Sequence, residues 1–200
     1  AQMNLFSGIE SKEIAGLLGC VQARCARYSK DEMITEEGHR VHEFGVMLSG
    51  HGRSIKWDTS DRLIIITLLK KGSEIGVLLA AQPEQKSPVS VQAKDNVSVL
   101  LIPYDRILAR CGKACPKHER LLRNYIAIVA EKGLVLHERI NCLLKPTVRE
   151  KILTYLLRVS REQKSPSFSI PLNRNTMSEY LNIERSALSR ELSSMKQDGL

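Results

Sequence analysis

The chain has few aromatic residues and no long apolar run. Its 200 residues include only one Trp, five Tyr and three Phe. No segment reaches the roughly 18 consecutive apolar residues of a membrane-spanning helix. The first residues, AQMNLFSGIE, also lack the basic region and apolar core of a signal peptide. We therefore expect a cytoplasmic protein with no membrane partner.

Cysteines are also few, and their pattern does not predict a disulfide framework. Their number is odd, and their spacing is not that of a small disulfide-bonded domain. This pattern favours reduced thiols, as in a reducing compartment. The five cysteines are Cys20, Cys25, Cys111, Cys115 and Cys142.

Catalytic motifs are absent as well. No phosphate-cradling glycine loop, no HExxH metal motif and no GxSxG nucleophile elbow occurs in the sequence. Most histidines are scattered through polar segments and suggest no catalytic dyad: His39, His42, His51 and His137. We therefore predict that the chain is not an enzyme.

Positive charge, by contrast, is in excess. Lys and Arg number 30 against 22 Asp and Glu, so the formal net charge is +8. From Lys145 onward there are ten basic and six acidic residues, so this last quarter carries half of the excess. A basic chain favours a polyanionic partner without identifying it.

The first half of the chain has the pattern of a small β-structure. Residues 3–19 predict a short helix that ends at Gly19. From Val21 to about Pro103, short segments alternate or run apolar, and glycines and polar turns separate them. About eight short strands without long helices between them are typical of a compact β-barrel or roll.

A long helix is predicted next, from Pro116 to near Leu144, with two apolar stripes. One stripe would cover the β-structure of its own chain: Leu121, Tyr125, Ile128 and Val135. The other has the alternating spacing of four and three residues that defines a coiled-coil seam: Leu122, Ile126, Val129, Gly133, Leu136, Ile140 and Leu143. We expect this seam to bind a second copy of the chain; the alternative is a monomeric core helix.

Pro146 breaks the long helix and marks a predicted hinge, since proline cannot donate to the preceding turn. A helix is expected over residues 147–161, and SFSIPL is expected to form a short strand. Two further helices are predicted over residues 174–181 and 185–197, with residues 182–184 as the turn.

This helix pair has an apolar side and a cationic side. The apolar side is predicted to pack inward: Met177, Leu181, Leu188, Leu192 and Met195. Arg185, Ser186, Ser189, Arg190 and Ser193 remain on the outer face of the second helix. Guanidinium groups and short hydroxyls suit the major groove of DNA, which admits an α-helix. The alternative is an ordinary helical hairpin with a solvated polar face.

The order of these elements resembles the Crp/Fnr superfamily of bacterial transcription regulators over essentially the whole chain. MLSGHGRSIKW and LLKKGSEIG are similar to its strand-Gly-strand hairpin and to the glycine turn before its effector pocket. LNRNTMSEYLNIERSALSRELSSMKQDGL is similar to its DNA-binding motif. The resemblance implies an α+β fold with an N-terminal cyclic-nucleotide-binding-like jelly roll, a long dimerisation helix and a C-terminal winged helix-turn-helix.

The same resemblance implies domains and partners. We expect a sensing roll over residues 1–115, a coiled-coil dimerisation helix over 116–145 and a DNA-binding domain over 146–200, which would end before the wing. The implied protein is a homodimer that binds a pseudo-palindromic DNA operator in response to an effector, with RNA polymerase as a candidate partner. Its implied DNA contacts are Arg174, Arg185, Ser186, Ser189 and Arg190.

The effector pocket is expected at the glycine turn and the segment that faces it: Gly72, Glu74, Ile75, Gly76, Val77, Ser87, Pro88 and Val89. In the cyclic-AMP receptor branch, the positions of Val77 and of Ser87–Pro88 hold a Glu that binds the ribose and an Arg–Ser pair that binds the phosphate. Valine accepts no hydrogen bond, and Ser-Pro has no guanidinium. We therefore predict that cyclic AMP is not the ligand.

Two other kinds of cofactor depend on cysteine or histidine ligands. An iron–sulphur cluster is not expected, because Cys20 and Cys25 are too few and Cys25 fits an inward strand position. Cys111, Cys115 and His118 have spacings of four and three, which could gather a metal, haem or redox site. The alternative is packing thiols with a surface histidine.

A different class of function also stays open. The chain could be a ligand-binding regulatory subunit that uses its helical end for protein contacts rather than DNA contacts. Salt dependence separates the two, because binding to several DNA phosphates weakens steeply with salt.

Overall fold

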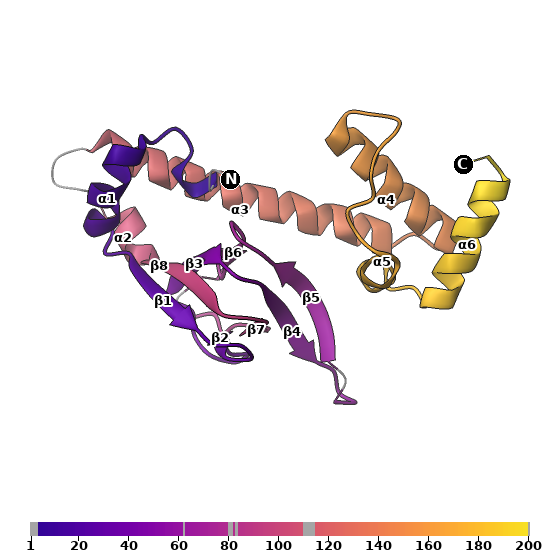
Figure 1. The fold of residues 1–200 in the computed structure, drawn as a ribbon, viewed down its shortest axis with the longest axis horizontal. Helices are drawn as coiled ribbons and strands as arrows, with labels where there is room; N and C mark the ends of the chain where they lie inside the picture. The colour runs from indigo at the N-terminus through magenta and orange to yellow at the C-terminus, as the bar shows by residue number, and fades with distance from the viewer. Residues whose placement is uncertain (1–3, 62, 80–81, 83, 110–114, 200) are drawn as a thin grey trace. The chain divides into compact units, whose positions relative to one another are not determined.

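The computed structural model describes residues 4–61, 63–79, 82, 84–109 and 115–199. Their contacts form two compact units, Ala1–Lys132 and Gly133–Leu200, so the division falls inside the long helix α3 (Pro116–Leu143). The first unit contains the strands and the second contains the C-terminal helices (Figure 1).

The strands form two four-stranded antiparallel sheets with the orders β1-β8-β3-β6 and β2-β7-β4-β5. This arrangement is a jelly roll and confirms the predicted fold class. The strands are β1 (Arg24–Tyr28), β2 (Met33–Thr35), β3 (Glu43–Ser49), β4 (Gly52–Trp57), β5 (Leu63–Leu69), β6 (Glu74–Ile75), β7 (Ser90–Ala93) and β8 (Val97–Pro103).

Strand β8 shows why the roll has two cores. Successive side chains of a strand point to opposite faces. Val97, Val99 and Leu101 therefore lie in the core between the sheets, whereas Leu100 and Ile102 lie in a second core. Both faces of β8 are buried, which explains its nearly continuous apolar run.

Helices fill the second core. The helix α1 (Ser11–Cys20), the short α2 (Tyr104–Leu108) and the first part of α3 each contribute apolar residues. On α3 these are Leu121, Tyr125 and Ile128, all at most 3% exposed, which confirms most of the predicted inward stripe. Its fourth member, Val135, is 42% exposed.

The N-terminal helix is shorter than predicted. Residues Asn4–Phe6 form one 3-10 turn, and α1 begins only at Ser11. Gly8 lies between them with φ +73°, a left-handed conformation that interrupts a right-handed helix.

The second unit is a bundle of α4 (Val148–Gln163), α5 (Arg174–Leu181) and α6 (Arg185–Gln197) with the end of α3. Thr147 and Glu150 form a capping box at the start of α4. The predicted strand SFSIPL was wrong, because residues 167–172 have no partner strand among the described residues and form no ladder.

Candidate nucleic-acid interface and sensing site

The helix pair α5–α6 follows the predicted boundaries. The Asn173 side chain caps α5 by accepting from the Thr176 amide at 3.0 Å. Asn182 ends α5 in the left-handed conformation, at φ 49°. Asparagine tolerates this conformation, so it takes the place that glycine has in many such turns.

Glu184 caps α6, a role the sequence reading missed. Its carboxylate accepts from the amides of Ser186 and Ala187 at 3.0 and 3.1 Å and from the Ser186 hydroxyl. The Ser186 hydrogen bonds hold the pKa of Glu184 below its ordinary value. The amides at the start of α6 are therefore already occupied by a carboxylate.

The apolar faces of the pair are buried as predicted. Met177, Leu181 and Leu188 are at most 1% exposed, Met195 is 3% exposed, and Leu192 packs partly against them. Burial of this face fixes which residues of α6 remain outside.

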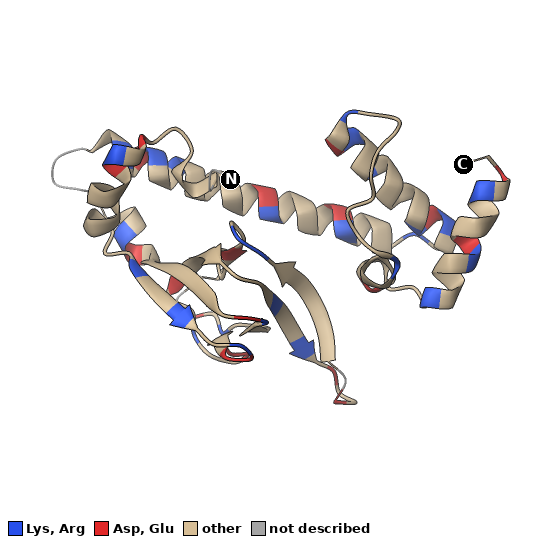
Figure 2. Cartoon of the chain, viewed as in Figure 1, with Lys and Arg blue, Asp and Glu red and all other residues tan. Residues whose placement is uncertain are grey.

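Exposed cations lie on the outer side of the pair. Arg174, Arg185 and Arg190 are exposed, and none of them forms an ion pair with another described residue. Figure 2 shows basic positions along α6 and at the start of α5. The predicted hydroxyls are less available: the Ser186 hydroxyl binds Glu184, and Ser189 is half-buried. Among the five predicted DNA contacts, the three arginines are therefore the most available side chains.

Arg149 of α4 holds α6 in place. Its Nε lies 2.8 Å from a carboxylate oxygen of Glu191, and its Nη2 binds the carboxylate of Asp198. The Asp198 hydrogen bond raises the pKa of Arg149. Both partners lie more than 40 positions away, so no local sequence pattern could have identified this link.

The predicted seam of α3 is largely uncovered. Ile126, Leu136 and Ile140 are 58%, 49% and 53% exposed. Leu122 and Val129 pack partly against the roll core, Leu143 is half-buried, and Gly133 is exposed. Leu134 and Leu144, outside the predicted seam, are 66% and 77% exposed. The helix thus presents a row of apolar side chains to solvent.

The predicted effector residues are mostly engaged with other groups. Glu74 forms an ion pair with Lys132 of α3 at 2.9 Å. The Tyr125 hydroxyl donates to the carbonyl oxygen of Val77 at 2.7 Å. Ile75 and Val77 lie in the two cores, and the buried Ser87 hydroxyl donates to the carbonyl oxygen of Val89 at 2.7 Å. Gly72 and Gly76 have positive φ, and Pro88 is exposed.

A cavity of about 490 Å³ lies elsewhere in the roll. Arg24 and Glu43 form an ion pair of 2.6 Å at its wall. None of the eight predicted effector residues lines it; its lining comes from β1, β2, the segment before β3, Glu43 and Leu101.

The structure describes two of the three residues of the predicted metal, haem or redox site, Cys115 and His118. Cys111 lies outside the described residues. His118 is buried rather than on the surface: its Nε2 lies 2.7 Å from the carbonyl oxygen of Ile107, and its Nδ1 lies 4.0 Å from the Cys20 sulphur. In the described part of the chain, no three His, Cys, Asp or Glu residues are grouped as metal ligands.

The inward position predicted for Cys25 was wrong, because this thiol is exposed. In the antiparallel pairing of β1 with β8, Cys25 lies opposite Leu100, whose side chain faces the helices. However, β1 lies at the edge of its sheet, where only β8 neighbours it.

Two protein families match parts of this chain. The cyclic nucleotide-binding domain family matches residues 25–113, and the Crp-like helix-turn-helix domain family matches residues 150–200, together more than half of the chain. The chain is 28% identical over 127 residues to the transcriptional activator protein FnrA of Stutzerimonas stutzeri, a match that covers 61% of this chain and 50% of FnrA. It thus spans about half the length of the curated relatives it matches.

Solved structures share the fold. FixK2 from Bradyrhizobium japonicum is 24% identical, with a TM-score of 0.59 over 88% of this chain and 86% of that one. A CooA mutant from Carboxydothermus hydrogenoformans is 16% identical, with a TM-score of 0.66 over 100% and 89%.

These matches define a class of regulator in which a nucleotide-binding type of roll is joined to a Crp-like helix-turn-helix. The chain belongs to the Crp/Fnr superfamily, as its order of elements predicted. The matched relatives are regulators, in agreement with the prediction that the chain is not an enzyme. Within the described residues, no helix is both long and apolar enough to cross a membrane.

Proposed function

We propose that the chain is a DNA-binding transcription regulator that acts as a homodimer and responds to an effector. The observation that carries the proposal is the exposed outer face of α5–α6, with three arginines that have no ion-pair partner among the described residues. The match to a Crp-like helix-turn-helix family supports it.

Arg185 and Arg190 are the proposed base-reading groups, together with Ser186. The first residues of the second helix meet base edges in this geometry, and a guanidinium can bind O6 and N7 of guanine with two hydrogen bonds. Arg174 and Ser189 are the proposed phosphate contacts. Because Glu184 occupies the amides at the start of α6, a phosphate there would meet a carboxylate. We therefore assign phosphate binding to side chains such as Arg174.

The α3 seam is the proposed dimer interface. A row of half-exposed Ile and Leu side chains on one helix gains free energy when a second copy removes it from water. Dimerisation would place two copies of α6 about 34 Å apart, one turn of DNA, and so favour a pseudo-palindromic operator. Contact with RNA polymerase belongs to this proposal as an expectation from the family.

Two contacts support a route from the roll to α3. Lys132 and Tyr125 of α3 bind Glu74 and Val77 on either side of Gly76. An effector that displaced this segment would change both contacts and thereby bias α3. The proposed domains remain residues 1–115, 116–145 and 146–200.

The effector pocket is proposed at the same segment, from Gly72 to Val77 with Ser87 to Val89, and the ligand is proposed not to be cyclic AMP. Calorimetric titration with cyclic AMP should give no heat of binding. Micromolar affinity for cyclic AMP would overturn this part of the proposal. No iron–sulphur cluster or metal is part of it.

Substitution on α6 tests the DNA contact. The duplex is one that the protein itself selects from a random library, and affinity is measured by fluorescence anisotropy. Arg185→Ala should cost roughly 1–3 kcal/mol of binding free energy and relax specificity at one base pair per half-site. Lys196→Ala, which removes a charge from the last turn of the same helix, is the matched control.

The control should retain the sequence preference of the native protein. Unchanged operator affinity in Arg185→Ala would contradict the proposed recognition surface. Circular dichroism of both variants establishes that any loss does not come from unfolding.

A further inference from the structure

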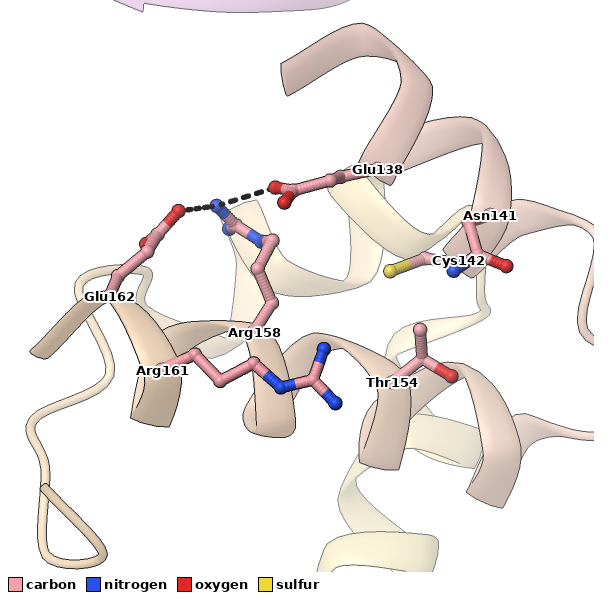
Figure 3. Close-up of a pocket in the computed structure, with 7 residues that line it drawn as sticks. All are labelled: Glu138, Asn141, Cys142, Thr154, Arg158, Arg161 and Glu162. Carbon is pink, nitrogen blue, oxygen red and sulfur yellow. Dashed lines mark hydrogen bonds and ion pairs between the residues drawn. The ribbon is translucent and has the colours of Figure 1, made fainter. Parts of the chain in front are cut away.

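A small cavity lies inside the second unit, between the last turns of α3 and the second half of α4. Its volume is about 120 Å³. Figure 3 shows the side chains that surround it. They come from two helices only: Glu138, Asn141 and Cys142 from α3, and Thr154, Arg158, Arg161 and Glu162 from α4.

Arg158 is a fixed side chain at this cavity. Its Nη1 lies 2.6 Å from Glu162 and 3.8 Å from Glu138, and its guanidinium lies 5.2 Å from the ring centre of Tyr155. These contacts hold the group in place. Its Nε is buried and has no hydrogen-bond partner among the described residues. This nitrogen has almost no accessible surface, so a ligand in the cavity does not reach it.

Arg161 and Asn141 supply the accessible donors of the cavity. Arg161 is exposed and forms no ion pair with a described residue, and the Asn141 amide has no hydrogen bond within the described part of the chain. In Figure 3 the Cys142 sulphur faces the space between the two helices, and the Arg161 side chain runs along α4 toward Thr154. Both carboxylates of the cavity are already bound to Arg158. The accessible groups that lack partners are therefore the Arg161 guanidinium and the Asn141 amide.

The chemistry of these donors selects the ligand. A guanidinium has five N–H donors in a planar fork that matches carboxylate and phosphate oxygens. Burial raises the pKa of the Cys142 thiol, so this side chain stays neutral and does not repel an anion. A cavity of about 150 Å³ holds a benzene molecule, which has six carbon atoms. The present cavity thus suits a ligand with at most about six non-hydrogen atoms.

We propose that this cavity binds a small oxyanion, either inorganic phosphate or a short carboxylate, through the side chains of Arg161 and Asn141. Such a ligand would join the end of α3 to α4. A change in DNA affinity on anion binding would depend on the proposed function, whereas the binding of the anion itself does not. The site is distinct from the sensing roll, since every residue that lines it lies in the Gly133–Leu200 unit.

Isothermal titration of the full chain, without DNA, tests the proposal. Sodium phosphate and sodium acetate are titrated separately at an ionic strength held constant with sodium chloride. Saturable binding of either anion at one site per chain is expected. The anion whose titration saturates identifies the class of ligand, because phosphate is tetrahedral and acetate is planar.

Two variants decide whether the cavity is the site. Arg161→Gln should weaken binding at least about tenfold, the equivalent of about 1.4 kcal/mol. Lys151→Gln removes the same charge from the same helix outside the cavity and should bind as the native chain does. Asn141→Ala should also weaken binding, without any change of charge.

Three results would overturn the proposal. One is the absence of saturation with both anions. Another is equal affinity in Arg161→Gln and the native chain, which would assign the anion to another surface such as the arginines of α6. The third is equal weakening in Arg161→Gln and Lys151→Gln, which would show a general effect of charge.

Discussion

The hydroxyl of Tyr125 offers a sharp test of how α3 is joined to the roll. It donates to the carbonyl oxygen of Val77 at 2.7 Å, and the residue is 3% exposed. Tyr125→Phe keeps the ring, which packs against Phe44 and Tyr104 at centroid distances of 5.0 and 5.4 Å. The substitution leaves the Val77 carbonyl buried without this donor. The expected cost is about 1–3 kcal/mol of unfolding free energy.

Thermal unfolding measures this cost. For a chain of this size, each kcal/mol lowers Tm by roughly 2–4 °C. Tyr28→Phe is the matched control, because the Tyr28 hydroxyl is half-buried and has no hydrogen bond to a described residue. The control should change stability by no more than about 0.5 kcal/mol. Equal falls in Tm for the two variants would refute the hydrogen bond as a link between α3 and the roll.

The pH dependence adds a second readout. Burial raises the pKa of Tyr125 to about 12, against about 10 in the unfolded chain. Between these values the unfolded chain releases a proton that the folded chain retains, so stability is lost as the pH rises. The stability that Tyr125 contributes is fully present below pH 10. The difference between the native chain and Tyr125→Phe should therefore narrow from about pH 10 to about pH 12.

Two further substitutions test the long helix and the second unit. Leu136→Asp should shift the proposed dimer to monomer in sedimentation velocity, because it places a carboxylate in the apolar seam. Leu157→Asp, at a similarly exposed position of α4, should leave the dimer intact. A dimer of native affinity in Leu136→Asp would contradict the seam as the dimer interface. Thr147→Ala removes the capping box of α4 and should destabilise the second unit by about 1 kcal/mol in urea unfolding, whereas no change would show that the cap is redundant.

Local patterns predicted the helix pair well. Asn173 is a side-chain cap, and apolar residues recur on one face of α5 and α6, so both boundaries followed from neighbouring residues. The alternating strands of the roll and the two-stripe pattern of α3 followed for the same reason. These features depend on residues that are close in sequence.

Features that depend on distant residues could not be predicted in this way. The Arg149–Asp198 link, the burial of His118 and the exposure of Cys25 each depend on which element covers which. SFSIPL has the composition of a strand, but a strand also needs a partner, and composition does not supply one. Glu184 is different: its place immediately before α6 was visible, and an acidic side chain near a helix N-terminus is stabilising.

The salt dependence of DNA binding tests the central claim most directly. Affinity of the native chain for its selected duplex is measured from low to high salt. DNA binding predicts a linear fall of log K with log salt, with a slope of about −0.9 for each phosphate contact. The Arg174 side chains of a dimer alone therefore predict a slope of about −2 or steeper. An affinity for the duplex that does not change with salt, or no affinity at low salt, would contradict a DNA-binding function and favour protein contacts at the helical end.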